Sequence, residues 1–460
     1  MTLQLNIIDL ILPSLFGIAI LSFVALYFEA KRLSAIVILL FSFLIFSSSL
    51  YAAYIGTNAM YLGAIHIYPF SMLFVAIISI GVLLVGMSAY DYSKDYCAFA
   101  SMLGLSLIAG FVVATSSTLL SILLGLELMA ILASMLILLE GRHRIEAAVK
   151  LFIMGSLFAA LFTFGAAILL QFNNGVSLNG PISGTGYAII LAMLLIIASL
   201  GFETAIFPFN LWIPDVYSGS PGFITAMLAG INKKVAFVGL ILVLFVSFGA
   251  MAKTYSPIIE ALAIFTMFYG NLLALSQKNV KRMLAYSSIS QAGYILVGIA
   301  AASISGLSAA IFYIFAHSFM IIGAFIVVLV LESKNIQKVD EYTGLFQRSG
   351  ILGISLSIFM LSMAGIPPLI GFFGKFLLFY SAVNSKLLFL AIVGIVNSFL
   401  SIYYYGRVIN AIFTQRKQRH IHIGVMALIA IIVPLIIVVA FGLFPQPIIN
   451  LASIAAKSII

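Results

Sequence analysis

Six ionisable side chains lie within long apolar stretches of the sequence, and their types could support proton transfer. They are Glu127, Glu203, Lys233, Lys234, His317 and Lys375. A charge at the centre of a lipid bilayer costs at least ~2.5–3.5 kcal/mol, so such residues are functional candidates. Glutamate, lysine and histidine each exist in two forms that differ by one proton, and burial brings the pKa of a lysine or a carboxylate closer to neutrality. The set therefore predicts movement of protons or similar cations along buried side chains, and it does not indicate covalent chemistry.

A structural role is the alternative for each of these residues, because an isolated buried charge can pair with a backbone carbonyl or hold two helices together. Their recurrence in one predicted span after another favours a transfer path. Arginine could not serve, since it is effectively always protonated, and no arginine occurs in the middle of a predicted span. We expect Glu127, Lys233 and Lys375 to face the protein interior, because exposure to lipid is too costly.

The sequence offers little basis for a metal, phosphate or redox site. Its single cysteine, Cys97, excludes a thiolate metal site or iron–sulfur site of the usual spacing. Neither a Gly-rich phosphate loop nor a His-Glu-x-x-His motif is present. His66 and His143 fall in predicted loops, as do His420 and His422, which together supply only two of the ligands that a metal site needs.

The elements that carry the six residues are predicted to be transmembrane helices. Hydrophobic residues make up 64% of the chain and charged residues 8%, and the mean hydropathy is +1.25. An ordinary soluble domain contains about a quarter charged residues. Because one crossing takes about 20 apolar residues, the sequence offers about 14 such stretches and no room for a soluble domain. We therefore predict an all-α integral membrane protein.

The predicted spans are 6–28, 34–54, 68–89, 97–115, 118–139, 146–172, 186–207, 222–248, 256–277, 283–303, 306–331, 350–370, 383–411 and 422–444. The first is expected to be retained, because no Ala-x-Ala-like cleavage site follows it.

Basic residues gather in alternate loops between these spans. They are Lys31, Arg32, Arg142, Arg144, Lys278, Lys281, Arg282, Lys334, Lys338, Arg348, Arg407, Arg416, Lys417 and Arg419. Segments 55–67, 173–186 and 301–306 contain no lysine or arginine. The positive-inside rule then predicts an even number of spans, with both termini on the outer face of the plasma membrane. Membrane topology thus explains the net charge of +9 better than nucleic-acid binding does.

Two predicted spans are interrupted by proline-containing segments that lie five spans apart. The seventh span runs into residues 208–215, and the twelfth meets Gly365-Ile366-Pro367-Pro368 before it continues to Lys375. Proline removes a helix hydrogen bond, and backbone freed at membrane depth must face protein or a water-filled cavity. Paired breaks at matching positions are typical of inverted-repeat transporters. An ordinary proline kink is the alternative for either break alone.

Several motifs follow one another between about residues 115 and 410. They are PFNLWIPDVYSGSP at 208–221, GNLLAL at 270–275, VKRMLAYSSIS at 280–290, the segment 361–375, and Asn397-Ser398 with Tyr403-Tyr404-Tyr405. In this order they resemble the antiporter-like membrane subunits of respiratory complex I (NADH-quinone oxidoreductase), most closely those of the N type.

The resemblance implies about 14 transmembrane helices with two inverted five-helix repeats and two discontinuous helices. Helices 1–3 would occupy residues 1–96, the first repeat 97–248, the second repeat 249–411 and the last helix 412–460. Each repeat would contain a half-channel, and a central hydrophilic axis would join the two.

The resemblance also assigns roles to residues. Glu127 matches the family's glutamate of the fifth helix, Lys233 its lysine of the eighth and Lys375 its lysine of the twelfth, while Glu146 matches a secondary acid. Where the family has a lysine in the seventh helix, this chain has Glu203. The family's Glu–Lys pair cannot form there, so the two carboxylates should share one proton or recruit Lys150 or Lys234. The alternative for Glu203 is a tolerated substitution.

The resemblance implies partners as well. Subunits of this kind hold no redox centre, so quinone, iron–sulfur clusters and a flavin or other donor cofactor are expected in partner subunits, namely other membrane subunits and a peripheral redox arm. The chain alone would then not be catalytic. Related subunits occur in cation/proton antiporters and in membrane-bound hydrogenases, and His317 in Phe315-Ala316-His317-Ser318-Phe319 resembles antiporter and other pumping subunits. These two assignments and a non-conducting scaffold are the alternatives.

Overall fold

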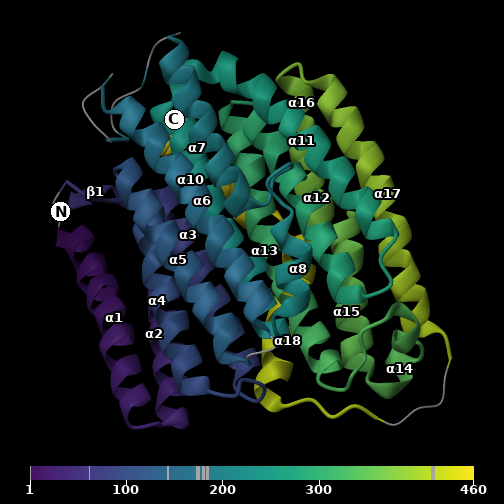
Figure 1. Ribbon diagram of the computed structural model, residues 1–460. Coiled ribbons are helices and arrows are strands. Elements are labelled where there is room, and N and C mark those ends of the chain that lie inside the picture. The colour runs from purple at the N-terminus through teal and green to yellow at the C-terminus, as the bar shows by residue number, and fades with distance from the viewer. Residues whose placement is uncertain are drawn as a thin grey trace.

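The protein is described by a computed structural model that covers residues 2–61, 63–141, 144–171, 177–178, 182, 186–415 and 420–460, with the backbone alone for residues 2–9. It is a bundle of helices with α1 at one edge and α17 at the opposite edge (Figure 1). Both termini lie toward the same end of the bundle (Figure 1), as an even number of crossings requires.

Thirteen helical segments of the described chain are long and apolar enough to cross a membrane. Two shorter apolar helices, α15 (Gly350–Ala364) and α16 (Ile370–Asn384), flank the second break and together provide one more crossing. The all-α membrane fold and the predicted spans are therefore confirmed.

The first half of the chain forms α1 (Thr2–Tyr27), α2 (Lys31–Ile55), α3 (Pro69–Ala89), α4 (Tyr96–Ala114), α5 (Leu119–Leu139), α6 (Ile145–Leu169), α7 (Tyr187–Thr204), α8 (Trp212–Gly219), α9 (Gly222–Met227), the π-helix η2 (Leu228–Asn232), α10 (Lys233–Ile241), the π-helix η3 (Leu242–Ser247) and the 3₁₀ turn η4 (Gly249–Met251). The second half forms α11 (Ala252–Leu275), α12 (Val280–Ala300), α13 (Ile304–Glu332), the 3₁₀ turn η5 (Val339–Tyr342), α14 (Leu345–Arg348), α15, α16, α17 (Leu388–Phe413), α18 (Val425–Leu443) and α19 (Gln446–Lys457).

Two elements were not predicted. A short antiparallel hairpin, β1 (Ala59–Tyr61) and β2 (Ile65–Ile67), follows α2, and Met60 pairs with His66. Each strand has three residues, which is too short to give a periodic signal. The helix α19 follows α18 and packs against α13 and α3, so the chain does not finish with the last predicted span.

The first break begins where α7 ends. Ala205 has a left-handed backbone with φ of 63°, and the N–H of Ile206 donates to the carbonyl of Gly201 at 2.8 Å. This closure across six residues is a Schellman motif, which satisfies carbonyls that the end of a helix leaves free. The chain then passes through proline-containing turns and continues as α8.

The second break has the same geometry. Gly365 follows α15 with φ of 90°, and the N–H of Ile366 donates to the carbonyl of Leu361 at 3.0 Å. Glycine adopts this backbone without steric cost. Because five crossings separate the two breaks, the chain passes through them in opposite directions, as inverted repeats require.

Gly371 allows α16 to start directly against the end of α15. Its N–H donates to Ser362 Oγ at 3.1 Å, and a Cβ at this position would fall on the Ser362 carbonyl. The two helices therefore approach one another with backbone against backbone. This close approach fixes the start of the helix that carries Lys375.

We expect Gly371→Ala to destabilise the protein by about 1–3 kcal/mol, because the added methyl group overpacks a backbone contact. A lower thermal unfolding midpoint of the detergent-solubilised protein would be the measurement. Gly406→Ala is the matched control, since no atom of the described residues lies within 4 Å of a Cβ at this helical position. An unchanged midpoint for Gly371→Ala would show that the break tolerates a wider spacing.

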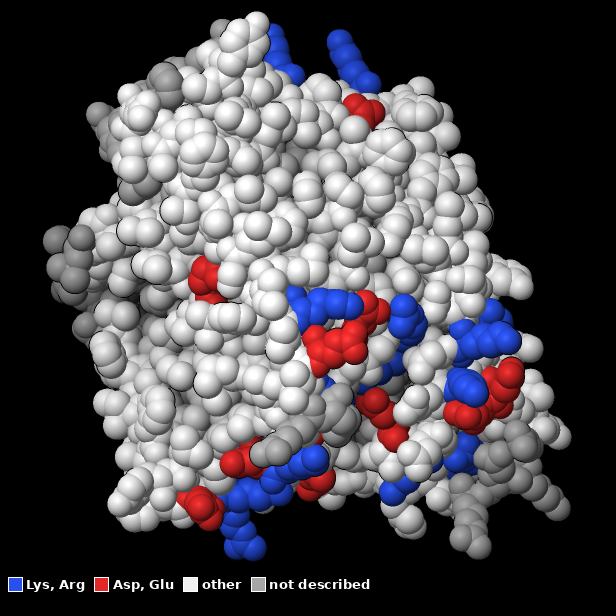
Figure 2. All heavy atoms as spheres, viewed as in Figure 1, with Lys and Arg blue, Asp and Glu red and all other residues white. Residues whose placement is uncertain are grey.

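The centre of the bundle is formed by α12 and α13. Residues of α12 are almost all buried, and those of α13 are nearly so. Helices α3, α9, α15, α16, α18 and α19 surround α13, which lies near the middle of the molecule (Figure 1). Most charged side chains of the face in Figure 2 lie in its lower half, apart from a few at the top.

Candidate functional site

Lys233 lies at the junction between a π-helix and an α-helix. It begins α10 directly after the π-helix η2, and only 2% of it is exposed. A π segment inside a helix frees carbonyls from their usual partners and often marks a functional position. Lys233 Nζ donates to the carbonyl of Ser288 at 2.5 Å and to its hydroxyl at 3.2 Å. The lysine is thus held against α12 by hydrogen bonds to neutral groups.

Lys234 points to a different partner. Its Nζ lies 2.5 Å from Nδ1 of His317 on α13, and both residues are fully buried. With Nδ1 as the acceptor, the proton of a neutral imidazole stands on Nε2. Nε2 has no hydrogen-bond partner among the described residues. His317 can therefore receive a proton on one side of its ring and present one on the other.

His317 also lies within electrostatic reach of Lys233 and Lys375. Its ring stacks on Tyr313, one helical turn away, with 6.3 Å between the ring centroids. His317 thus interacts with lysines from both halves of the chain. Sequence position alone could not give this placement, because Lys234 and His317 are 83 residues apart.

A row of uncharged polar groups continues from His317. The hydroxyl of Tyr313 donates to Gln291 Oε1, and Gln291 Nε2 donates to the hydroxyl of Tyr405 at 3.4 Å and to the carbonyl of Met363 at 3.3 Å. Tyr405 in turn shares a hydrogen bond with Ser287. These residues connect α12 and α13 with the end of α15 and with α17.

Lys375 closes the row at the second break. Its Nζ donates to the carbonyl of Ala364 at 3.2 Å and to the hydroxyl of Ser398 at 3.0 Å. The ammonium lies 4.3 Å from the ring centroid of Tyr294, in cation–π contact. A cavity of about 490 Å³ lies beside it, between α16 and α17. The contact with the last carbonyl of α15 fits a structural role as well as a proton relay.

The polar groups of α12 were missed by the sequence analysis. Gln291, Ser287 and Ser288 are fully buried, yet no single one of them is ionisable. The sequence signal that could have found them is the hydropathy of the whole helix, because α12 has the lowest hydropathy of the candidate spans. In the structure it is also the most completely buried of these spans. A membrane helix that is both polar and buried must place its polar side chains against other helices.

Glu127 and Glu203 lie apart from this row. They interact electrostatically with each other, and both are half-buried. Glu127 borders an exposed apolar face of α5, where Leu124 is 59% and Leu128 39% exposed. Lys233 and Lys375 face the interior as predicted, whereas Glu127 is only partly covered by its own chain.

The predicted recruitment of a lysine by the two carboxylates was wrong. Lys150 Nζ lies 2.6 Å from Asp215 instead, and Lys234 is engaged by His317. Asp215 attracts Lys150 because α8, which follows the break, places its carboxylate beside α6. Glu127 and Glu203 interact electrostatically with each other, and the sharing of one proton between them stays a prediction.

Glu146 lies outside the buried row. It is in the first turn of α6 with 89% of its side chain exposed, 3.9 Å from Lys150. Arg282 reaches Asp215 from α12 at 3.5 Å. These charges form a surface network at the basic end of the bundle, where each pair is screened by water.

The loop histidines differ among themselves. His66 is partly buried, donates from Nε2 to Asn58 Oδ1 at 3.1 Å and stacks on Tyr68 with 4.3 Å between the centroids. Burial lowers its pKa, so it is neutral at pH 7. His420 and His422 are exposed, and His143 lies outside the described residues. Within the described ranges, no cluster of three metal-ligating side chains occurs.

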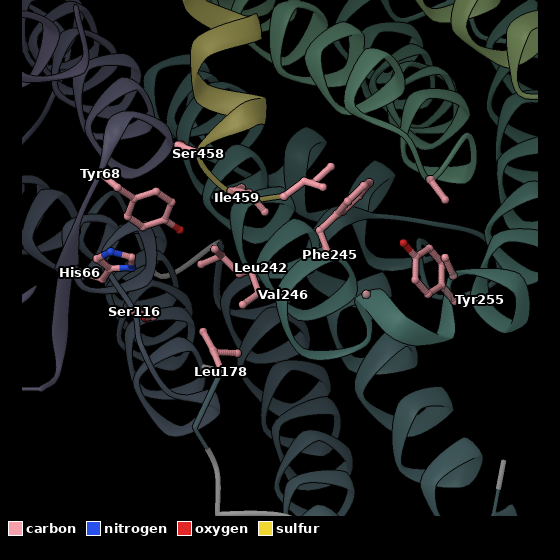
Figure 3. Close-up of a pocket in the computed structure, with 14 residues that line it drawn as sticks. His66, Tyr68, Ser116, Leu178, Leu242, Phe245, Val246, Tyr255, Ser458 and Ile459 are labelled. Carbon is pink, nitrogen blue, oxygen red and sulfur yellow. The ribbon is translucent and has the colours of Figure 1, made fainter. Parts of the chain in front are cut away.

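A cavity of about 590 Å³ opens at the end of the bundle opposite the basic loops. His66 and Tyr68 line one side of it and Tyr255 the other, with Ser458 and Ile459 of the C-terminal segment between them (Figure 3). Among the described residues, no lysine, arginine, aspartate or glutamate side chain lines it.

Comparison with known proteins places the chain among membrane subunits of this construction. Residues 116–401 match the family described as NADH:quinone oxidoreductase/Mrp antiporter, transmembrane. The chain belongs to this family. All seven proposed residues, from Glu127 to Lys375, lie within the matched range, and the predicted resemblance over about residues 115–410 is confirmed.

Two members of the NADH:quinone oxidoreductase/Mrp antiporter family illustrate the similarity. NADH-quinone oxidoreductase subunit N of Desulforamulus reducens is 36% identical over 360 residues, which cover 75% of each chain. F(420)H(2) dehydrogenase subunit N of Methanosarcina mazei is 32% identical over 420 residues, which cover 85% of this chain and 83% of the relative.

Solved structures agree with the family assignment. A chain of respiratory complex I from Thermus thermophilus matches with a TM-score of 0.83 and 28% identity over 96% of this chain and 99% of that chain. A chain of the Mrp complex from Dietzia matches with a TM-score of 0.90 over 99% and 97%, but at 19% identity. The second match therefore speaks for the fold alone.

Proposed function

We propose that this chain is a proton-translocating membrane subunit of a quinone oxidoreductase related to complex I. The observation that carries the proposal is the group of buried polar side chains in the middle of the bundle, which includes Lys233, Lys234, His317 and Lys375. The names of the relatives at 32–36% identity, NADH-quinone oxidoreductase subunit N and F(420)H(2) dehydrogenase subunit N, support the same assignment. In this function, electron transfer in partner subunits drives proton movement through the chain.

In the proposed mechanism the proton path has two halves. Residues 97–248 provide Glu127, Glu203 and Lys233, and residues 249–411 provide His317 and Lys375. Lys234 belongs to the first repeat by sequence but is hydrogen-bonded to His317 of the second, so this pair is the natural connection between the halves. A proton can pass across it because imidazole has two nitrogens, one to accept and one to donate. Glu146, exposed at the end of α6, would act only as a surface acid.

The half-buried carboxylates support a role as a subunit. A carboxylate beside lipid is costly, and Glu127 adjoins an exposed apolar face of α5. A neighbouring membrane subunit packed on this face would remove the cost. We further propose that the plasma membrane holds the protein with its basic loops inside and both termini outside, because the basic residues gather at one end.

A cation/proton antiporter or a membrane-bound hydrogenase subunit is the alternative. The likeness to the Mrp complex rests on fold at 19% identity, whereas the relatives named subunit N share more sequence with this chain. The quinone, the iron–sulfur clusters and the flavin or other donor cofactor are assigned to partner subunits. The only cysteine of the chain, Cys97, is free and buried, which does not suit a cluster ligand.

We expect the affinity-tagged chain, extracted from its own membrane in mild detergent, to copurify with other hydrophobic subunits and with a peripheral arm that absorbs as iron–sulfur protein. The isolated chain, reconstituted alone in liposomes, should neither reduce quinone nor exchange cations for protons. Active cation/proton exchange by the isolated monomer would contradict the proposal and support the antiporter alternative.

A further inference from the structure

A buried ion pair closes the basic end of the bundle. Lys281 stands at the start of α12 and Glu332 at the end of α13. Lys281 Nζ lies 2.9 Å and 3.0 Å from the two carboxylate oxygens of Glu332 and also donates to the carbonyl of Ser220. The side chain of Lys281 is 5% exposed and that of Glu332 is 23% exposed. Solvent therefore reaches the carboxylate of Glu332, whereas the amine of Lys281 is enclosed.

A small cavity of about 30 Å³ adjoins the pair. A site of this size has room for one or two water molecules. Ser218 and Tyr342 line it together with the ion pair. The hydroxyl of Tyr342 is buried without a hydrogen-bond partner among the described residues, and burial together with the nearby Glu332 raises its pKa, so it remains a donor. The cavity is thus lined by groups that can orient water.

Tyr217 is the neighbour of the cavity residue Ser218 along the chain. It lies in α8, and its ring packs edge-to-face on Phe325 at 5.8 Å. Its hydroxyl is fully buried near Ser288 and has no hydrogen-bond partner within the described chain. Ser288 is the residue that binds Lys233. Ser288 lies two turns after Lys281 on the same face of α12, about 10 Å along the axis.

We propose that Lys281, Glu332 and Tyr217 form the gate through which Lys233 takes up protons from the basic side of the membrane. The inference rests on the proposed function. A proton from solution first binds the Glu332 carboxylate, which thereby loses its charge and its hold on Lys281. Glu332 then gives this proton to water in the cavity and becomes a carboxylate again. The water carries the proton to the Tyr217 hydroxyl, which donates its own proton to a neutral Lys233 amine as it accepts the new one. One proton enters, and Lys233 gains one positive charge.

Tyr217→Phe tests the gate in the whole complex, reconstituted in proteoliposomes, where proton uptake and quinone reduction are measured together. The variant keeps the ring packing against Phe325 and removes only the hydroxyl. We expect coupled proton translocation to fall at least about tenfold, since a positioned proton-transfer group commonly contributes 10²-fold or more. Tyr255→Phe, a buried tyrosine at the opposite end of the bundle, is the matched control and should pump normally.

Glu332→Gln and Glu332→Asp separate titration from structure. The gate predicts loss of translocation with glutamine and partial retention with aspartate, because only the latter keeps an acid. Equal pumping by both variants, or normal pumping by Tyr217→Phe, overturns the gate. If Glu332→Gln does not assemble, Tyr217→Phe alone decides. If Lys233→Met blocks pumping while the gate variants pump normally, the gate fails and the proposed function stands; if Lys233→Met also pumps normally, the proposed function itself fails.

Discussion

Replacing Lys375 with methionine should leave a complex that assembles normally but translocates fewer protons per electron. Methionine retains much of the apolar stem and loses the titratable amine, so packing should change by no more than about 1.5 kcal/mol. The amine now donates to the Ala364 carbonyl and the Ser398 hydroxyl at the second break. Without this amine, the proposed proton path has no titratable group at the second break. The proton-to-electron ratio or the coupled turnover of the complex in proteoliposomes is the measurement.

Lys375→Arg distinguishes this role from a structural one. If Lys375 only neutralises the carbonyl at the end of α15, arginine should restore both assembly and pumping, because it keeps the charge. If Lys375 releases a proton, arginine should assemble and fail to pump, since it stays protonated. The cavity of about 490 Å³ beside Lys375 provides space for the larger side chain. Normal pumping by Lys375→Met at normal assembly would end the assignment as a relay.

Lys233→Met should abolish nearly all coupled proton translocation, with a loss of about 10²-fold or more expected for a positioned proton carrier. Lys233 lies where the π-helix meets α10, and its hydrogen bonds to Ser288 connect it to α12. Lys234 cannot replace it, because its amine is committed to His317. Initial rates of proton uptake, measured with quinone reduction in the same vesicles, would report the loss.

Lys253→Met is the control for this substitution, since Lys253 is exposed and belongs to the same chain. It should assemble and pump as the unmodified complex does. Quinone reduction in the Lys233→Met complex should slow in sealed vesicles, because electron transfer and proton transfer are coupled in the proposed function. Unimpaired pumping by Lys233→Met would remove Lys233 from the path and favour the scaffold alternative.

Glu203 gives the first half of the chain a different electrostatic character from that of the family. The resemblance implies a glutamate–lysine pair at these two positions, whereas here both residues are carboxylates, and Lys150 and Lys234 are bound to Asp215 and His317 instead. Two carboxylates at close range hold a proton between them more readily than either would alone. In the proposed path, Lys233 is therefore the cation of the first half.

Much of the fold could be predicted because membrane helices are specified locally. Every predicted span corresponds to a helix of the structure, and both interruptions fall at the predicted proline segments. The hairpin of β1 and β2 and the terminal α19 were missed, since the former has very short strands and the latter is amphipathic rather than apolar. The π turns before and after α10 also had no signal in the sequence.

The sequence by itself determined that the chain crosses a membrane many times, where the helices break and that Lys233, Lys234, His317 and Lys375 are buried. The physical reason is that a lipid core excludes water, so each span must satisfy its own backbone and each buried charge stands out. Only the tertiary structure decided which residues these buried side chains bind. Lys233 meets Ser288 across 55 residues and Lys234 meets His317 across 83, and these distances depend on how α12 and α13 pack at the centre of the bundle. Likewise, Lys150 forms an ion pair with Asp215 because α8 packs against α6. No local sequence pattern encodes this packing.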